Sequence, residues 1–253
     1  MKPYNEKFII DKIKEYSINI KVDEVGKYKI IKRDGLQGII DGYLYESKGE
    51  LKVSIPELIG EERVWMRIGP KEIESSYEAI KFAKGKVGVV GLGLGYVVQE
   101  MAKKKEVKEI VVYEISQDVI DLYKRNFKNN KKIKIILGDA YEAKREKFDF
   151  FYVDIYEYKL SLKVVEDYIK FNDLHDIENY TFWGMEHFLL SCSYDEIVWV
   201  FIPEIWMDMS KDISNNLDKS GYIKDYKRLD EELVSEVLAA FKTILNEGEE
   251  EFI

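Results

Sequence analysis

The sequence is poor in the residues that disulfides and metal centres require. Cysteine occurs once in 253 residues, as Cys192, so no internal disulfide can form. We therefore expect a reducing, cytoplasmic location. The two histidines, His175 and His187, stand twelve residues apart with no cysteine or further histidine at ligand spacing. No metal site is expected from that pattern.

Long hydrophobic runs and an excess of positive charge are also missing. No apolar run approaches the roughly 18 residues of a membrane-spanning helix, and no signal-peptide pattern opens the chain, so no membrane partner is expected. Lysine and arginine number 39 against 48 acidic residues, a net charge of −9. Because affinity for nucleic acid depends on basic side chains that neutralise phosphates, general nucleic-acid binding is not expected.

The most informative stretch is Lys86–Gly95, which reads Lys-Val-Gly-Val-Val-Gly-Leu-Gly-Leu-Gly. Its short β-branched run predicts a strand buried on both faces. Gly91, Gly93 and Gly95 then permit a tight turn and let a ligand approach the backbone closely. A helical pattern follows directly, so the free N–H groups of a helix N-terminus face the same turn. The stretch is predicted to bind a ligand.

Three further predicted strands are each followed by an acid. These strands and the residues after them are Lys108–Tyr113 with Glu114, Lys132–Leu137 with Gly138 and Asp139, and Phe148–Val153 with Asp154. Ligands of an open parallel α/β sheet bind beyond the carboxyl ends of its strands, so we expect these acids to line one crevice. Glu114 stands twenty-three residues after Gly91, which suits an acid that holds a ribose hydroxyl pair.

Residues 86–157 resemble the core of class I S-adenosylmethionine-dependent methyltransferases, and within that superfamily the spermidine-synthase-like branch. The matching segments are Gly91–Gly95, Val112–Ser116 and Leu137–Ala140. The resemblance implies an α/β fold with a doubly wound, mostly parallel, Rossmann-like methyltransferase sheet. It also implies S-adenosylmethionine as the cofactor.

The resemblance further implies a role for each matching residue. Glu114 would hold the ribose hydroxyls, Asp139 the adenine amino group, and the glycine loop the methionine portion. The expected cofactor-binding residues are Gly91, Leu92, Gly93, Gly95, Glu114, Ile115, Asp139, Ala140 and Asp154.

A dinucleotide site is the alternative for the same loop. The dinucleotide fingerprint needs a third glycine where this chain has Tyr96, and it leaves Asp139 without a role. The methyl-donor interpretation explains both positions, so we favour it.

Carboxylates near the acceptor are the candidate catalytic groups. Methyl transfer from a sulfonium is an in-line displacement in which the enzyme mainly aligns a nucleophile, and an amine acceptor must be neutral to attack. Asp154 is our candidate for orienting such an acceptor, and capping of the following helix is its alternative role. Glu157 completes Asp-Ile-Tyr-Glu, which resembles the Asp-x-x-Asp of aminopropyltransferases that recognises a polyamine amino group.

Tyr77 is the third catalytic candidate. Its segment, Glu74–Glu78, resembles the one that borders the reacting end of the donor in aminopropyltransferases, with Ser76 where histidine or glutamine is expected. The alternative is that Tyr77 is a core residue and Glu78 lies on a solvated helix face.

The N-terminal quarter has a different character. A helix is predicted over Asn5–Tyr16. Short β-prone runs follow at Tyr28–Ile31, Gly38–Tyr45, Leu51–Ile55 and Val64–Ile68, the first three separated by turn signals at Asp34-Gly35 and Lys48-Gly49. We expect a helix and a small antiparallel β segment over residues 1–68, then a methyltransferase-like domain over 69–253. The resemblance implies that such a β-rich piece can mediate a homo-oligomer.

Apolar spacing alone predicts the remaining elements. The predicted helices are Lys71–Ala83, Gln117–Phe127, Leu162–Phe171, Asp176–Ser191 and Glu231–Leu245. Ile197–Pro203 has the composition of a fifth sheet strand, or of the start of a buried helix.

Three functions remain open on this sequence. The first is methyl transfer from S-adenosylmethionine to a small or medium-sized acceptor molecule. The second is aminopropyl transfer from decarboxylated S-adenosylmethionine, suggested by Asp154 and Glu157. The third is a catalytically silent protein that binds the donor or acts through oligomerisation.

Overall fold

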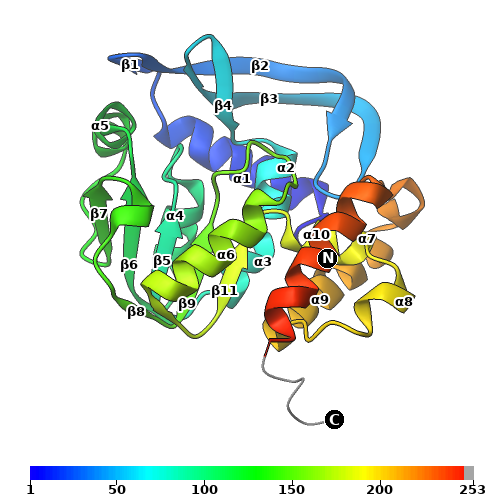
Figure 1. The fold of residues 1–253 in the computed structure, drawn as a ribbon. Helices are drawn as coiled ribbons and strands as arrows, with labels where there is room; N and C mark the ends of the chain where they lie inside the picture. The colour runs from blue at the N-terminus through cyan, green and yellow to red at the C-terminus, as the bar shows by residue number, and fades with distance from the viewer. Residues whose placement is uncertain (248–253) are drawn as a thin grey trace.

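The computed structural model describes residues 1–247, apart from the side chain of Ile39. Three parts are seen in Figure 1: an N-terminal helix with an antiparallel sheet, a parallel α/β sheet, and a group of C-terminal helices. The last six residues of the expected second domain, 248–253, lie outside the described residues. In the described part, no helix is both long and apolar enough to cross a membrane.

The N-terminal helix is α1 (Glu6–Asn19). Asn5 caps it, because the Asn5 side-chain oxygen accepts the N–H of Phe8 at 2.9 Å. Ile9, Ile13 and Tyr16 form its buried face. The predicted helix over Asn5–Tyr16 is thus confirmed and extends by three residues.

The antiparallel sheet has the order β1-β2-β3-β4 and forms a layer across the top of the molecule in Figure 1. Its strands are β1 (Asp23–Val25), β2 (Tyr28–Asp41), β3 (Glu46–Gly60) and β4 (Arg63–Arg67). The predicted turns at Asp34-Gly35 and Lys48-Gly49 are wrong. Gly35 sits at φ +74° within an irregularity of β2, and Gly49 pairs with Gly38 inside the ladder. The chain turns instead at 42–45.

The parallel sheet confirms the predicted fold class. Its order is β11-β9-β5-β6-β7, and every neighbouring pair is parallel. The strands are β5 (Gly85–Val90), β6 (Val107–Glu114), β7 (Ile133–Leu137), β9 (Phe150–Val153) and β11 (Tyr180–Phe182). A small ladder of β8 (Lys147–Phe148) with β10 (Asp176–Ile177) lies beside it.

The winding direction of the sheet reverses between β5 and β9. The chain passes outward from β5 through α4 (Tyr96–Ala102) and α5 (Gln117–Asn126) to β7, then returns to β9 beside β5. From β9 it continues the other way through α6 (Lys163–Leu174) to β11. Since such crossovers are right-handed, α4 and α5 cover one face and α6 the other. The reversal opens a crevice beyond the strand ends, where ligands of such sheets bind.

The predicted position of the fifth strand is wrong. The fifth strand is β11, which lies inside the predicted helix Asp176–Ser191, and only α7 (Met185–Ser191) of that segment is helical. The three residues of β11 are all buried, and such a short segment shows neither the alternation of a strand nor the spacing of a helix. Ile197–Pro203 follows α8 (Tyr194–Ile197) without forming a strand, and Trp199 there is 70% exposed.

Helices close the edge of the sheet where β11 ends it. Trp206, on α9 (Glu204–Ser220), donates its indole N–H to the carbonyl of Tyr180 at 2.6 Å. The 3₁₀ turn η2 (Tyr222–Asp225) and α10 (Glu231–Leu245) follow, and α10 has its predicted bounds. The Trp206 bond satisfies a carbonyl that a further strand would otherwise bind.

The predicted helix Lys71–Ala83 is divided in two. It forms α2 (Pro70–Ser75) and α3 (Tyr77–Phe82), separated at Ser76. The Ser76 hydroxyl donates to the carbonyl of Glu72. This helical pair leads the chain from the antiparallel sheet into β5 and brings Glu72 toward the crevice.

Candidate functional site

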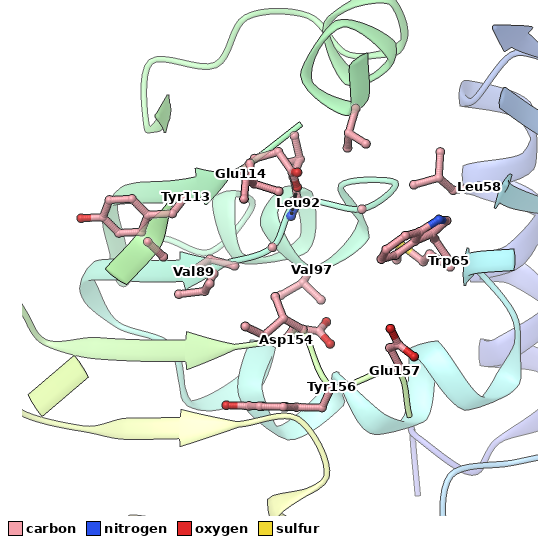
Figure 2. Close-up of a pocket in the computed structure, with 18 of the residues that line it drawn as sticks. Leu58, Trp65, Val89, Leu92, Val97, Tyr113, Glu114, Asp154, Tyr156 and Glu157 are labelled. Carbon is pink, nitrogen blue, oxygen red and sulfur yellow. Dashed lines mark hydrogen bonds between the residues drawn. The ribbon is translucent and has the colours of Figure 1, made fainter. Parts of the chain in front are cut away.

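A cavity of about 340 Å³ lies at the carboxyl ends of β5, β6, β7 and β9. Figure 2 shows its labelled lining residues, with Tyr113 and Glu114 on one side and Leu58 and Trp65 on the other. Its lining combines strand ends, the loop after β9, the helix α2 and the antiparallel sheet. The volume falls within the range of about 300–1,000 Å³ that is usual for small-molecule sites.

We call the lining residues at the strand ends the floor. They are Gly91, Leu92, Gly93, Glu114, Ile115, Asp139 and Ala140. All seven were expected to bind the cofactor, and the structure brings them to one cavity. Their roles toward a ligand stay predictions.

Glycine is required in the loop because other backbone and side-chain atoms approach it. Gly91 has φ +97°, and a Cβ there would lie 2.6 Å from the carbonyl oxygen of Asp154. Gly93 has φ +50°, and its Cβ would collide with the sulfur of Met66. The loop therefore lies closely between the end of β9 and the antiparallel sheet, with its backbone open to the cavity.

Glu114 is the last residue of β6 and holds the glycine loop in place. Its carboxylate accepts the N–H of Leu92 at 3.0 Å and that of Ser116 at 2.8 Å. The side chain is 9% exposed, and burial raises the pKa of Glu114 although these N–H bonds act in the opposite direction. A carboxylate fixed in this way keeps lone pairs available for hydroxyl groups of a ligand.

Asp139 and Ala140 follow β7 at the same end of the sheet. The Asp139 carboxylate accepts the N–H of Tyr141 at 2.9 Å and so caps the 3₁₀ turn η1 (Ala140–Glu142). Ala140 is buried, whereas the Ile115 side chain, at the end of β6, is 74% exposed. Ile115, Asp139 and Ala140 all line the cavity, so an acid and two apolar side chains are available to a ligand there.

Two expected site residues lie outside the cavity lining. Gly95 has φ +78° and caps α4, and its Cβ would lie 2.6 Å from the ring of Tyr123, so close packing explains the glycine. The ring of Tyr77 packs edge-on against Phe8 at 6.1 Å between centroids. The structure thus places Tyr77 against α1, as the core alternative expects, and its catalytic role stays a prediction.

Glu78, the neighbour of Tyr77, is not on a solvated face. It is fully buried, and burial, aided by Asp212, raises its pKa to about 9. The solvated alternative for this residue is therefore wrong.

Asp154 stands at the end of β9 and points into the cavity in Figure 2. Burial, together with the nearby carboxyl group of Glu72, raises the pKa of Asp154 well above its usual value. It does not cap the following helix, because α6 begins after Leu162. Its position leaves the carboxyl group for a ligand.

Glu157 also lines the cavity, but its carboxylate is engaged at the rim. It accepts a hydrogen bond from the guanidinium of Arg63, on β4, at 2.6 Å. Glu157 and Tyr158 both adopt left-handed backbone, with φ +50° and +59°. That conformation turns the chain between Asp154 and α6, and it costs on the order of 1 kcal/mol or more for each residue.

The antiparallel sheet supplies a side of the cavity that sequence patterns did not indicate. Its lining side chains are Tyr28, Leu58, Trp65 and Met66, which we call the roof. The Met66 sulfur accepts the N–H of Leu94 at 2.9 Å, so roof and glycine loop are in direct contact. The sequence did not predict this contact, because Met66 and Leu94 are 28 residues apart and belong to no common motif.

Glu72 and Tyr158 are also lining residues that were missed. Glu72 is 2% exposed and accepts the hydroxyl of Tyr158 at 2.8 Å. Burial raises the pKa of Glu72 to about 7. A glutamate in the first turn of a helix is so common that its position carried no signal.

Residues 76–153 match the family model of the methyltransferase small domain. No curated protein matches the chain. Among 112 matching chains of known structure, Trm5b from Pyrococcus abyssi is 15% identical, with 76% of this chain and 55% of that chain covered and a TM-score of 0.39.

Two more solved structures show the range of these similarities. Spermidine synthase from Thermotoga maritima is 11% identical, with 58% of this chain and 54% of that chain covered and a TM-score of 0.34. A putative RNA methyltransferase from Pyrococcus horikoshii is 18% identical, with 43% and 56% covered and a TM-score of 0.32. The chain spans about half the length of these structures.

The family match confirms the expected resemblance for the segment that contains the glycine loop, Glu114 and Asp139. Because the matched family is a methyltransferase domain, the match also confirms S-adenosylmethionine as the cofactor. The matched segment ends at Val153, directly before Asp154. Glu72, Asp154 and the roof therefore lie outside it.

Proposed function

Residues 76–153 are a methyltransferase domain of the S-adenosylmethionine-dependent class, and from that premise we propose that the chain transfers a methyl group to a small or medium-sized acceptor. The observation that carries the proposal is the single cavity shared by the glycine loop, Glu114, Asp139 and Asp154. The first three suit a nucleoside donor, and Asp154 is left for the acceptor.

The floor is proposed to hold the donor. The ribose hydroxyls bind Glu114, whose orientation is fixed by two backbone N–H groups. The adenine lies between Ile115 and Ala140, with its amino group on Asp139. The methionine portion lies along Gly91–Gly93, where a side chain on the loop would meet Asp154 or Met66. When bound, the donor supplies an electrophilic methyl group, and the chain's part is to align and desolvate the acceptor.

Asp154 is proposed to orient the nucleophile of the acceptor. Because the pKa of Asp154 is raised, its carboxylate form is a stronger base than an ordinary aspartate. It can therefore accept a proton from an ammonium or hydroxyl group more readily. The roof excludes water from the same space, which strengthens such polar contacts.

A small acceptor is favoured over nucleic acid on two grounds. The net charge is −9, and the roof narrows the cavity from the side opposite the glycine loop by lining it with Tyr28, Leu58, Trp65 and Met66. A gel-shift titration with RNA and DNA tests this, and saturable binding below micromolar concentration would contradict it.

Aminopropyl transfer is the second candidate, because both Asp154 and Glu157 line the cavity. The ion pair between Glu157 and Arg63 speaks against it, since it occupies the carboxylate that would bind a second amino group. A cytoplasmic location and a homo-oligomer also stay part of the proposal, and sedimentation of the purified chain tests the oligomer.

Donor binding tests the proposal directly. We expect S-adenosylmethionine and S-adenosylhomocysteine to raise the unfolding temperature, because a ligand at a hundred times its Kd stabilises by about 2.7 kcal/mol. A stronger response to decarboxylated S-adenosylmethionine would favour aminopropyl transfer. Donor binding without turnover against a panel of amines and hydroxyl compounds would favour the silent alternative. A response to nicotinamide dinucleotides only would refute all three.

A further inference from the structure

Trp65 reaches the cavity through an irregularity of its strand. Leu58 pairs with Met66, and the next pair along β3 joins Ile59 to Val64, so Trp65 is an extra residue of β4 between the two pairs. Neighbouring residues of a regular strand point to opposite faces of a sheet, yet Trp65 and Met66 both line the cavity. A β-bulge redirects a side chain in this way, and bulges are frequent beside active sites.

The Trp65 ring is fixed in this position. Its indole N–H donates to the carbonyl of Gly60 at 2.9 Å. The ring of Tyr28, another lining residue, lies 6.1 Å away between centroids. A Cβ at Gly60 would lie 2.5 Å from the Tyr28 ring and 3.1 Å from the indole nitrogen, so glycine is needed there for the two rings to pack together. A ring that is held in place before a ligand arrives loses little freedom when the ligand binds.

Arg63 covers one face of the same ring. Its guanidinium carbon lies 3.5 Å from the centroid of the Trp65 ring, and the guanidinium donates to Glu157 at 2.6 Å. Trp65 belongs to the cavity lining, whereas Arg63 does not. The covered face is therefore the one turned away from the cavity, and the opposite face is left for a ligand. We call Trp65 together with Arg63 and Glu157 the Trp65 platform.

The Trp65 platform suits a flat, uncharged ring better than a cation. A free aromatic face attracts cations because it carries partial negative charge. Here the guanidinium of Arg63 already lies on the ring, and its positive charge repels a second cation on the other face. An uncharged aromatic ring meets no such repulsion and gains from packing against the indole.

The Trp65 platform lies across the cavity from the proposed site of the donor's own ring. Figure 2 shows Trp65 and Leu58 on the side opposite Glu114. Ile115 and Ala140, between which the adenine is proposed to lie, follow the ends of β6 and β7. The adenine therefore leaves the Trp65 platform to the second substrate.

We propose that the Trp65 platform binds a flat, uncharged aromatic ring of the acceptor. The inference rests on the proposed function, since it specifies the class of acceptor that enters the same cavity. It also gives Glu157 a different part from the one in the aminopropyl alternative, because its carboxylate holds Arg63 on the ring instead of binding an amino group.

Calorimetric titrations with matched probes test the Trp65 platform. 2-Naphthol and decahydro-2-naphthol share a carbon skeleton and a hydroxyl group, but only 2-naphthol is flat and aromatic. 1,4-Diaminobutane is the cationic probe. Each probe is titrated into the chain at about pH 7 with S-adenosylhomocysteine at saturation. We expect 2-naphthol to bind at least about tenfold more tightly than either of the other two probes.

Substitutions of Trp65 separate a flat face from apolar cover alone. Trp65→Leu keeps an apolar side chain without a ring. It should weaken the binding of 2-naphthol at least about tenfold and leave that of decahydro-2-naphthol within about twofold. Trp65→Phe keeps a smaller ring and should weaken the binding of 2-naphthol only about threefold. Trp199→Leu, at an exposed tryptophan outside the cavity lining, is the matched control and should change neither affinity.

Several results would overturn the Trp65 platform. Equal affinities for the two ring probes in the wild type would do so, as would an equal loss of both in Trp65→Leu. Tighter binding of 1,4-diaminobutane than of 2-naphthol would also overturn it and would favour a cationic acceptor. In each case binding of S-adenosylhomocysteine would still support the proposed function, whereas a wild type that does not bind S-adenosylhomocysteine would contradict both.

Arg63→Gln provides the second test if Trp65→Leu fails to fold. The change removes the positive charge behind the ring, so the face turned to the cavity should accept a cation more readily. We expect the preference for 2-naphthol over 1,4-diaminobutane to fall at least about threefold. An unchanged preference would overturn the Trp65 platform.

Discussion

The floor and the roof enclose one cavity with opposite chemistry. The floor presents the glycine loop, Glu114 and Asp139, whereas the roof presents the side chains of Tyr28, Leu58, Trp65 and Met66. The floor is built from consecutive strand ends of a parallel sheet, and the roof comes from an antiparallel sheet earlier in the chain. We therefore expect the floor to recognise the donor and the roof to exclude water.

The two regions are joined at few points. The Met66 sulfur contacts the glycine loop, and Arg63 pairs with Glu157 across the rim. At the far end of the same sheet, the loop between β2 and β3 is held by Glu74, which binds the N–H of Tyr43 and the hydroxyl of Tyr45. The following predictions test whether floor and roof contribute differently to binding and to stability.

The largest effect is expected from Glu114→Ala in the floor. The change removes the proposed ribose contacts, the bond to the N–H of Leu92 in the glycine loop and the bond to the N–H of Ser116. Hydrogen bonds to a charged group contribute about 1.5–3 kcal/mol each, so the affinity for S-adenosylhomocysteine should fall at least about a hundredfold. The free energy of unfolding should also fall, by about 1–3 kcal/mol. Calorimetry and urea denaturation measure the two, with Glu106→Ala, an exposed acid just before the same strand, as the control. Unchanged affinity would show that Glu114 does not contact the donor.

The floor could be predicted from the sequence because its signals are local. Gly91–Gly93, Glu114 and Asp139 each lie at the end of a short apolar strand, and parallel strands bring their carboxyl ends together without further information. Gly95 was expected at the site from the same glycine pattern and Tyr77 by resemblance, but both lie outside the cavity lining, close to Tyr123 and Phe8 respectively.

The roof and Glu72 could not be predicted in this way. Whether Trp65 and Met66 line the cavity depends on how β2 and β3 pair over their full length. Gly35 and Gly49 predicted turns, but both residues lie within the paired strands β2 and β3. The three-residue strand β11 was missed because burial on both faces leaves no periodicity in so short a segment. Pairing between strands that are distant in the sequence, rather than the preference of single residues, determines the structure of the roof and of β11.

The next effect concerns the anchor at the far end of the roof. Burial raises the pKa of Glu74 to about 8, while the unfolded chain ionises near pH 4.5. Between these values the folded state binds more protons, so this group stabilises the fold fully below about pH 4.5 and loses that contribution as the pH rises through about 8. Glu74→Gln imitates the neutral form and should reduce the loss of stability between pH 5 and pH 9, by roughly 1–4 kcal/mol.

Urea denaturation at several pH values measures this difference. Glu50→Gln, at an exposed position of the same sheet, serves as the control and should keep the wild-type pH profile. Glu186 binds the hydroxyl of Tyr43 at 2.8 Å, and burial raises its pKa to about 7. Some pH dependence therefore remains in the Glu74 variant. A profile identical to the wild type would show that Glu74 is not neutral in the folded state.

A double-mutant cycle tests the contact between roof and glycine loop. Gly93→Ala places a Cβ against the Met66 sulfur and forces a side chain into left-handed backbone, which costs about 1–2 kcal/mol from the backbone alone. Met66→Ala removes the steric part of the conflict. We expect the loss in the free energy of unfolding of the double variant to differ from the sum of the two single losses by at least about 0.5 kcal/mol, as is usual for residues in contact. Additive losses in the free energy of unfolding would mean that roof and loop move independently.

The smaller of the two effects on donor affinity is expected from Trp65→Ala in the roof. Trp65 is 36% exposed, and its indole N–H bonds only to the carbonyl of Gly60, so its loss should change the free energy of unfolding little. Its ring covers the cavity, and the apolar area lost on truncation amounts to roughly 1–2 kcal/mol of ligand burial. Affinity for S-adenosylhomocysteine should therefore fall about tenfold, which is less than for Glu114→Ala. Trp199→Ala, at a tryptophan that is 70% exposed and outside the cavity lining, is the matched control. An effect of Trp65→Ala as large as that of Glu114→Ala would mean that the roof recognises the donor rather than only covering it.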